Sequence, residues 1–472
     1  MKILFVSPVI HPFFKGKNPV SNETDAAVMT ADLSQALARR GDSVTVISVL
    51  PEGCQPGDRM ARRVTDLKIE FNGRNETVPV YEGRLDDSSA RALLLEMKPE
   101  PDVVLDEDLI ADPSLSEERA EWCKFFGKAV LAIGEELGLT ANVVHFHGDA
   151  VSLALVWPQQ GENSPDALVV SFYDPQKEGV FPASAIAGSE DSSKTAAQTA
   201  VMLSSAVLLP GPGCLGQIAF SKRRLALKSA LVAHPRVYGI MGGVDSGKYN
   251  PWKNPNIKAG YDAENLEGKK VCKRFLQSET GLSPRQDVPL VVVFLGTDRE
   301  DGTNLIAETV SDLVKEDMQF VFVGDALPGA KRRIKAAVEA NSSRVVSIPH
   351  NEKGITHLLA AADIVLAADE WAPWGRVALL GMAMGCVPVV HSTGGYSDVV
   401  VDWDPETRTG GGFKYRPSSS EELLSAIKRA GEVFRHPEDW DLMVAKNMKA
   451  APYWPDVIER FRNLYESLVE EN

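Results

Sequence analysis

Short apolar runs alternate with amphipathic stretches along this chain. Lys2 to Ser7 and Ser43 to Val49 are apolar runs, and between them Asp25 to Arg40 carries apolar residues at helical spacing until Gly41. A run that is apolar on both faces is typical of a parallel strand, and parallel strands need a crossover helix. The start of the chain therefore predicts a strand–helix–strand unit, whose ligand edge is expected at the loop from Pro8 to Thr24.

The same alternation continues to the end of the chain and falls into two halves. In the first half we expect strands at Leu67–Phe71, Val78–Tyr81, Asn142–Phe146, Ala167–Phe172, Ala206–Leu209 and Val237–Met241, and a helix at Glu117–Leu137. In the second half we expect strands at Leu290–Leu295, Gln319–Val323, Arg344–Ile348, Ile364–Ala367 and Val387–Val390, and helices at Thr303–Lys315, Ala330–Ala340, Glu352–Ala361, Val377–Met384, Ser420–Val433 and Trp454–Glu470. The pattern predicts an α/β fold with two Rossmann-like halves.

A change in composition separates the halves. After Tyr249 the sequence reads Asn-Pro-Trp-Lys-Asn-Pro, which is typical of a linker. We predict Rossmann-like domains over residues 1–245 and 246–450, facing each other across a cleft, and a helix in residues 451–472 that packs back on the first domain. Small-molecule sites are common between domains. The acid-rich segment Pro99 to Asp112 is expected to be solvated surface.

Composition narrows the choice of partners. The 472 residues are too many for one core, and 44% hydrophobic with 24% charged residues is typical of a globular protein. The net charge of -15 argues against nucleic acid or an anionic membrane as the main partner. The five cysteines are scattered without metal-ligand spacing, so we expect reduced thiols, a cytoplasmic location and no metal site.

Polar residues and glycines follow several of the predicted strands. His147 ends one strand, Tyr173 follows the next, and the turn Thr393-Gly394-Gly395 follows a strand of the second half. Ligands of doubly wound sheets bind beyond the carboxyl ends of the strands. Such a turn, with a helix start behind it, can direct backbone N–H groups toward an anion, or it can simply be a tight strand-to-helix turn. His147 can equally be a strand-end histidine whose neighbours satisfy it.

Several segments together resemble one known family. They are Lys2-Ile3-Leu4-Phe5-Val6-Ser7-Pro8, His145-Phe146-His147, Gly242-Gly243-Val244-Asp245 with Tyr249-Asn250-Pro251, Ser392-Thr393-Gly394-Gly395 with Asp398, and Tyr453-Trp454. They are similar to motifs of the glycogen/starch synthase family of retaining glucosyltransferases across nearly the whole chain. The resemblance implies the GT-B fold and transfer of glucose from a nucleotide sugar, ADP-glucose in the family, to an α-1,4-glucan. It implies no cofactor, because the nucleotide sugar is a substrate.

The resemblance also suggests roles for individual residues. It places His147 in catalysis with Glu370 as a replacement acid, Lys15, Thr393, Gly394 and Gly395 at the donor with Arg299 as a replacement cation, and Asp25, Tyr173, Gly243 and Trp374 at the acceptor side or elsewhere in the cleft.

The chain departs from the family where catalysis needs charge. The positions of the family's donor-site Arg and Lys hold Gly296 and Asp301, and the position of its sugar-binding Glu holds Ala372. The loop that follows Lys15 has lost its paired glycines. Two lost charge-assisted hydrogen bonds to the leaving diphosphate would cost roughly 3–6 kcal/mol, a factor on the order of 10²–10⁴ in rate.

Two functions therefore stay open. The first is a glycosyltransferase of weak or altered activity. The second is a catalytically inactive relative that binds glucan or regulates an active synthase, as a homo-oligomer or in a hetero-complex. A transferase for another activated sugar, or a phosphorylase-like reaction, has less support, because no lysine sits in a setting that suggests pyridoxal phosphate.

Overall fold

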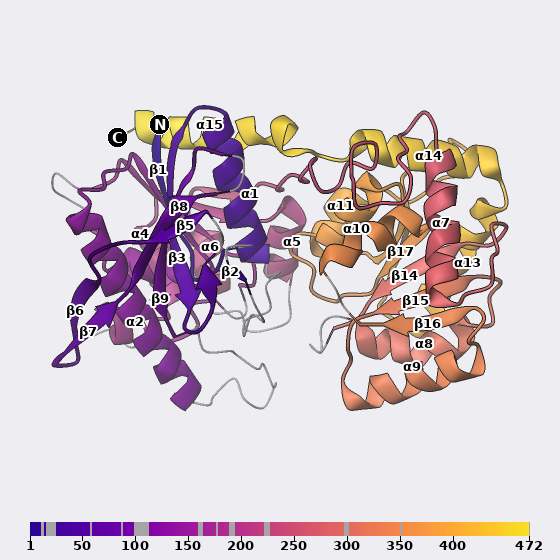
Figure 1. The fold of residues 1–472 in the computed structure, drawn as a ribbon, viewed down its shortest axis with the longest axis horizontal. Helices are drawn as coiled ribbons and strands as arrows, with labels where there is room; N and C mark the ends of the chain where they lie inside the picture. Colours follow the sequence, from indigo (N-terminus) through magenta and orange to yellow (C-terminus); the bar gives the residue numbers. More distant parts are fainter. Residues whose placement is uncertain are drawn as a thin grey trace. The chain divides into compact units, whose positions relative to one another are not determined.

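The computed structural model describes residues 1–10, 14–15, 25–56, 59–85, 88–98, 113–158, 164–175, 178–187, 194–220, 227–296, 302–349 and 352–471. The chain forms two compact units (Figure 1). Unit 1 is Met1–Gly243 together with Trp454–Asn472, and unit 2 is Val244–Tyr453. Unit 1 therefore takes the C-terminal helix, while the predicted boundary after residue 245 lies two residues beyond the observed one.

The main sheet of unit 1, within the described residues, has the order β13-β12-β11-β10-β1-β3-β9-β8-β5. Its strands are β1 (Lys2–Val6), β3 (Ser43–Pro51), β5 (Met60–Arg62), β8 (Val80–Arg84), β9 (Arg91–Met97), β10 (Val143–His147), β11 (Ala167–Ser171), β12 (Ala206–Leu209) and β13 (Val237–Gly239). All neighbours from β13 to β9 pair in parallel, whereas β8 pairs antiparallel with both β9 and β5. The predicted parallel arrangement is confirmed, and every residue of β10 and β11 is buried.

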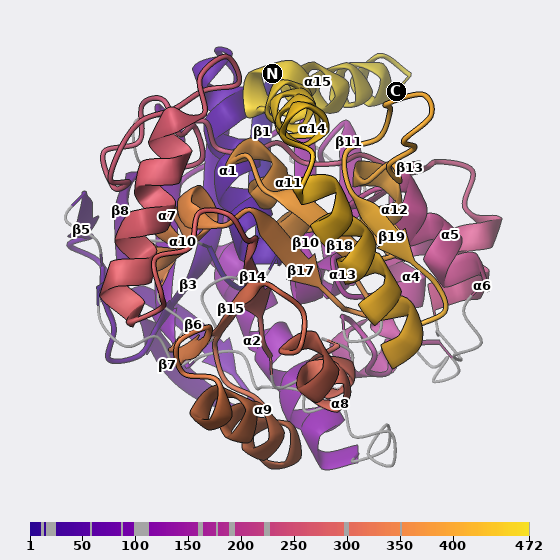
Figure 2. The same cartoon turned by 90° about the vertical axis from the view of Figure 1, so that its right-hand side faces the viewer.

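Two small antiparallel ribbons and a set of helices complete unit 1. The ribbons pair β2 (Phe14–Lys15) with β4 (Gln55–Pro56), and β6 (Leu67–Phe71) with β7 (Arg74–Val78). The helices are α1 (Asp25–Arg39), α2 (Pro113–Glu136), η1 (Gly148–Leu155), α3 (Ser184–Ala187), α4 (Ala196–Leu203), α5 (Pro212–Phe220), α6 (Leu227–Ala233) and α15 (Trp454–Glu470). Helices α1 and α15 lie side by side in Figures 1 and 2. Helix α15 buries one apolar face, which holds Tyr465 and Phe461.

Unit 2 contains a parallel sheet of order β16-β15-β14-β17-β18-β19 within the described residues. Its strands are β14 (Leu290–Phe294), β15 (Gln319–Val323), β16 (Val345–Ile348), β17 (Ile364–Ala367), β18 (Val387–His391) and β19 (Phe413–Tyr415). Its helices are α7 (Glu267–Thr280), α8 (Thr303–Leu313), α9 (Pro328–Ala340), α10 (Glu352–Ala361), α11 (Arg376–Ala383), α12 (Gly394–Val399), α13 (Ser420–Phe434) and α14 (Pro437–Ala450). Figure 2 shows α8 and α9 on one face of this sheet and α10 and α11 on the other.

The structure differs from the sequence predictions in several places. The stretch predicted as one strand, Val78 to Tyr81, is the junction between β7 and β8, because Pro79 interrupts it. Strand β9, which pairs along its whole length with β3, was not predicted. Its sequence Arg-Ala-Leu-Leu-Leu-Glu-Met has no period-2 alternation, so the pattern alone does not separate a buried strand from a helix. Helix α12 begins at Gly394 rather than near Tyr396.

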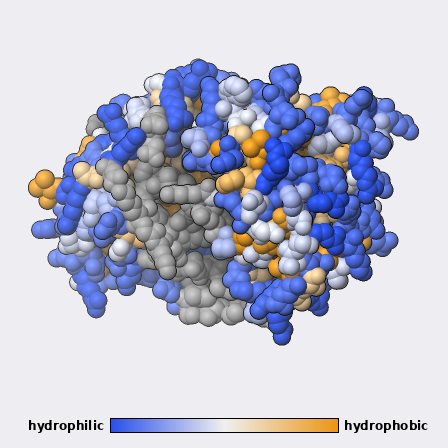
Figure 3. Space-filling view, turned by 45° about the vertical axis from the view of Figure 1, so that its right-hand side comes forward, coloured by the Kyte–Doolittle hydropathy of each residue, from blue (hydrophilic) through white to orange (hydrophobic). Residues whose placement is uncertain are grey.

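The surface agrees with the composition. Hydrophilic residues predominate on the face drawn in Figure 3, and apolar residues form only small groups there. All five cysteines carry free thiols, as expected. Among the described helices, none combines the length and apolar character that a membrane span requires. The same residues contain no group of His, Cys, Asp and Glu side chains placed to hold a metal ion.

Candidate active site

Two loops at the carboxyl edge of the unit 2 sheet are locked together by their backbones. The loop after β17 meets the turn after β18 where the Gly395 amide donates to the Ala372 carbonyl oxygen at 2.7 Å. A Cβ at Gly395 would lie 2.2 Å from the Trp374 carbonyl carbon, so only glycine fits. From the sequence, this turn could direct free amides at an anion or simply be a tight strand-to-helix turn. The Gly395 amide is bonded to Ala372 and is therefore not a free donor.

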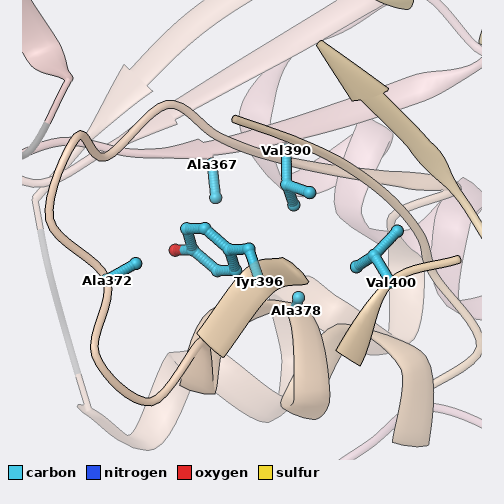
Figure 4. Close-up of a cluster of buried hydrophobic side chains, with 6 residues drawn as sticks. All are labelled: Ala367, Ala372, Ala378, Val390, Tyr396 and Val400. Carbon is cyan, nitrogen blue, oxygen red and sulfur yellow. The ribbon is translucent and has the colours of Figure 1, made fainter. Parts of the chain in front are cut away.

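A tyrosine fills the space beneath these loops. The ring of Tyr396 packs among five small apolar side chains, and together they form the Tyr396 cluster: Ala367, Ala372, Ala378, Val390, Tyr396 and Val400 (Figure 4). Tyr396 is 2% exposed, and Ala372 is 7% exposed. Ala372 stands where the resemblance places a sugar-binding Glu. The side chain at this position is therefore enclosed in an apolar cluster.

Asp369, an acid that the sequence did not point to, contacts this cluster. The Tyr396 hydroxyl donates to Asp369 Oδ2 at 2.7 Å. Glu370, the predicted replacement acid, is exposed, and its Oε1 accepts from the Ser418 hydroxyl at 3.3 Å. The Thr393 hydroxyl donates to the Glu370 carbonyl oxygen at 3.3 Å. The contact joins Asp369, which follows β17, to Tyr396 in α12. These residues are far apart in sequence, so no local sequence pattern could predict it.

Two further titratable rings lie beside these acids. His391 Nδ1 is 3.2 Å from the Asp369 carbonyl oxygen, and the centroids of the His391 and Tyr415 rings are 5.5 Å apart. Burial lowers the pKa of His391. Burial, and then the charges of Asp369 and Glu370, raise the pKa of Tyr415. Both rings are therefore uncharged at neutral pH.

Trp374 lies inside unit 2 rather than on an open face. It is 3% exposed, so almost no ring face is available for stacking on a sugar, and its predicted cleft role stays a prediction. Its indole Nε1, like that of Trp371, is buried and has no hydrogen-bond partner among the described residues. The two buried N–H groups are unusual, because most buried donors are paired.

The remaining donor-side predictions lie at the edge of what the structure describes. Arg299 and Asp301 fall outside the described residues, although both ends of their loop are placed. The Gly296 amide donates to Thr303 Oγ1 at 3.0 Å, which closes the loop at the start of α8. Lys15 lies in β2, and Asp25 begins α1; only their backbones are described.

His147 ends strand β10 of unit 1 and is completely buried. Its Nδ1 is 2.7 Å from the Tyr173 hydroxyl oxygen, so the two predicted residues are brought together. Its Nε2 has no hydrogen-bond partner among the described residues. Burial lowers the pKa of His147 to about 3, so the imidazole is neutral at physiological pH.

Two buried acids that the sequence did not point to, Asp149 and Glu178, lie on the segments that follow His147 and Tyr173. Glu178 Oε2 accepts from the Tyr173 amide at 2.8 Å. Burial, and then the neighbouring Asp174, raise the pKa of Glu178 to about 8. Asp149 forms an ion pair with Arg119 of α2 and also accepts from the Gly179 amide at 2.6 Å. Arg119 lies among the polar residues of an amphipathic helix, where nothing in the sequence distinguished it.

Gly243 has a packing role. A Cβ there would lie 2.6 Å from the Trp454 amide nitrogen and 2.9 Å from Val457 Cγ2. Because Gly243 has no side chain, the start of helix α15 can pack directly against its backbone. The cleft role predicted for Gly243 stays a prediction.

The two Rossmann-like units have the GT-B fold of glycosyltransferases. Residues 2–206 match the family described as starch synthase catalytic domain, and residues 289–432 match the family described as glycosyl transferases group 1. A glycogen synthase of Anaeromyxobacter sp. (strain Fw109-5) is 26% identical over 491 residues, with 99% of each chain covered. A glycogen synthase of Syntrophotalea carbinolica is 24% identical, with 100% of this chain and 99% of the relative covered.

The fold agrees with these sequence matches. The catalytic domain of starch synthase IV from Arabidopsis thaliana, solved with ADP and acarbose, matches with a TM-score of 0.84 at 21% identity, covering 99% of both chains. A sucrose-phosphate synthase from Thermosynechococcus elongatus matches with a TM-score of 0.61 at 15% identity, covering 100% of both chains. The resemblance to the glycogen/starch synthase family, predicted from the motifs, is confirmed.

Proposed function

We propose that this protein transfers glucose from ADP-glucose to the end of an α-1,4-glucan with retention, and that it does so slowly. In this reaction the bond from the anomeric carbon to the diphosphate breaks. A bond to the acceptor hydroxyl oxygen forms on the same face, ADP leaves, and the acceptor proton passes to the departing diphosphate or to solvent. The ADP and acarbose bound by the Arabidopsis starch synthase support this substrate pair. The free thiols favour a cytoplasmic location.

The enclosure of Ala372 in the Tyr396 cluster is the observation that carries the proposal of slow transfer. A carboxylate at this position would hold sugar hydroxyls, but a methyl group offers no hydrogen bond. Gly296 likewise supplies no cation for the departing diphosphate. Negative charge that develops in the transition state raises the activation free energy if no donor or cation stabilises it. The loss of one such donor can lower a rate by about 10²–10³. We expect turnover to be lower than in family members that keep these groups.

His147 supports a retained sugar site. A buried imidazole with one unpaired nitrogen, at the carboxyl end of a parallel strand, is suited to receive a neutral hydroxyl group. With a pKa of about 3, this imidazole does not exchange a proton near neutral pH, so its role is binding rather than acid–base catalysis.

The second candidate function is that of an inactive relative that binds glucan or regulates an active synthase. The same two positions, Gly296 and Ala372, favour it, because both have lost their charge while the strands and turns beside them are kept. This candidate predicts binding without turnover.

Both candidates are tested by incubating the protein with radiolabelled ADP-glucose or UDP-glucose and glycogen, and measuring label in the washed polymer. We expect slow incorporation from ADP-glucose, and a further loss in a His147→Gln variant. Binding of glycogen without incorporation from either donor would replace the first function by the second. If the protein neither binds glycogen nor incorporates label, both candidate functions are contradicted.

A further inference from the structure

Strand β10 carries two histidines that are held in nearly the same way. His145 Nδ1 is 2.7 Å from the Tyr465 hydroxyl oxygen, and His147 Nδ1 is 2.7 Å from that of Tyr173. The two pairs differ at the other nitrogen. His145 Nε2 is 2.7 Å from Ser171 Oγ, whereas His147 Nε2 has no partner among the described residues. One pair is thus complete, and the other lacks one hydrogen bond.

The chemistry of the two rings fixes the direction of the hydrogen bond. A phenol with a pKa near 10 is a stronger acid than a neutral imidazole N–H, and the unprotonated imidazole nitrogen is a stronger base than a phenol oxygen. The favourable arrangement therefore has the Tyr173 hydroxyl donating to His147 Nδ1. Because burial keeps the imidazole neutral, the single ring proton must then be on Nε2. At His145 the same argument places the Nε2 proton toward Ser171 Oγ.

Packing holds the His147–Tyr173 pair in this geometry. The two rings are inclined by only 10° with centroids 5.9 Å apart, so the short contact runs along the edges of the rings. Phe5 and His145 lie beside the His147 ring, with centroids at 5.2 and 4.0 Å. The amide of Tyr173 is fixed by Glu178 Oε2 at 2.8 Å.

We propose that Tyr173 is a positioning residue, which holds His147 in the tautomer with its proton on Nε2 and so presents one fixed N–H donor to a neutral oxygen of the sugar. A buried N–H group without a partner is energetically costly, and a ligand oxygen would remove that cost. The donor is uncharged, so it suits a hydroxyl rather than a phosphate oxygen. The part of the proposal that concerns the sugar rests on the proposed function; the tautomer does not.

The tautomer is tested directly on the full-length protein labelled with ¹⁵N-histidine. Long-range ¹H–¹⁵N spectra, with the His147 signals assigned by their loss in His147→Gln, are expected to show an unprotonated Nδ1 and a protonated Nε2. In Tyr173→Phe the Nδ1 resonance should shift as its hydrogen bond is lost. A protonated Nδ1 in the wild-type protein would overturn the proposal.

A matched pair of variants separates positioning from packing. Tyr173→Phe and Tyr465→Phe each remove one hydroxyl from one buried histidine, so both should lower the melting temperature. Only Tyr173→Phe is expected to lower kcat/KM for ADP-glucose, by about 3- to 10-fold, the worth of one hydrogen bond. An equal fall in both variants, or none in Tyr173→Phe, would make the role of Tyr173 structural only.

The tests also distinguish this inference from the proposed function. If the wild-type protein transfers no glucose, the proposed function fails, and titration of ADP-glucose and maltooligosaccharide into the labelled protein takes the place of kinetics. A shift of the His147 Nε2–H signal on binding, weakened in Tyr173→Phe and kept in Tyr465→Phe, would support the positioning role. A shift of the same size in Tyr173→Phe, or no shift with either ligand, would contradict it.

Discussion

The hydroxyl of Tyr396 donates to Asp369 Oδ2 at 2.7 Å and so ties helix α12 to the end of strand β17. This bond holds the Tyr396 ring against Ala372 (Figure 4). Ala372 is the residue at the position where the family has a sugar-binding glutamate. The loss of the acid at Ala372 is therefore accompanied by a tyrosine that packs against it. Restoring the family residue means making room for it as well.

Ala372→Glu alone should destabilise the protein by about 2–4 kcal/mol, because it forces a longer, charged side chain into an apolar cluster. Chemical denaturation measures the change. Adding Tyr396→Ala removes the ring that encloses the site, so the double variant should be less destabilised than the sum of the two single changes. The same double variant combined with Gly296→Arg is the one to assay for a gain of transfer. A single Ala372→Glu variant as stable as wild type would contradict this account of the cluster.

Glu178 gives a pH dependence of known sign. Its folded pKa is about 8 and its ordinary value is 4.5, so between these values the folded state binds more protons than the unfolded state. The contribution of Glu178 to stability is full below about pH 4.5 and declines as pH rises toward 8. Glu178→Gln should flatten the fall in melting temperature between pH 5 and pH 8, compared with wild type. Parallel curves for the two proteins would show that this carboxyl is already ionised in the folded state.

The histidines His145 and His147 show which features of the site the sequence predicts and which it does not. The apolar run before them placed both at the end of a buried strand, and the resemblance pointed to His147. The tyrosine partner of His145 is Tyr465, 320 residues away, and that of His147 is Tyr173, 26 residues away, so only tertiary packing brings them together. The same limit applies to Asp369, since the resemblance pointed to the exposed Glu370 beside it.

The fold was more predictable because its signals are local. Buried parallel strands appear in the sequence as continuous apolar runs. A glycine after a helical pattern predicts the end of the helix, and Gly41 has the positive φ, 96°, that this position requires. Strand β9 was not predicted, because its three consecutive leucines, Leu93 to Leu95, show no periodicity of hydrophobic and polar residues. Gly243 was singled out as a motif residue, but its contact with Trp454 depends on a helix 211 residues later in the same unit.

Lys269 is expected to be a major contributor to the stability of unit 2. Its Nζ donates to the carbonyl oxygens of Leu359, Ala360 and Met384 at 2.9 to 3.3 Å, at the carboxyl ends of α10 and α11. Lys269→Met should cost about 1.5–3 kcal/mol, because it removes the charged donor from three buried carbonyl groups and leaves them with the neutral Tyr261 hydroxyl and Cys386 thiol. Lys270→Met, on the exposed side of the same helix, is the control and should change the melting temperature little. Equal effects of the two substitutions would show that the carbonyl contacts of Lys269 add nothing.

Gly395→Ala tests the lock between the two loops of unit 2. The added Cβ would lie within 2.2 to 2.6 Å of the backbone of Trp374 and Gly375, and backbone cannot move aside as a side-chain tip can. We expect a loss of about 2–4 kcal/mol in stability, within the range of overpacking and backbone strain. Gly329→Ala in helix α9 is the matched control: no heavy atom lies within 4 Å of its added Cβ, and alanine favours helix, so it should be neutral or stabilising. Denaturation of both variants, followed by glycogen incorporation at a temperature where each is folded, would show whether the lock also matters for transfer. If Gly395→Ala is as stable as Gly329→Ala, the two loops are not held in the contact described here.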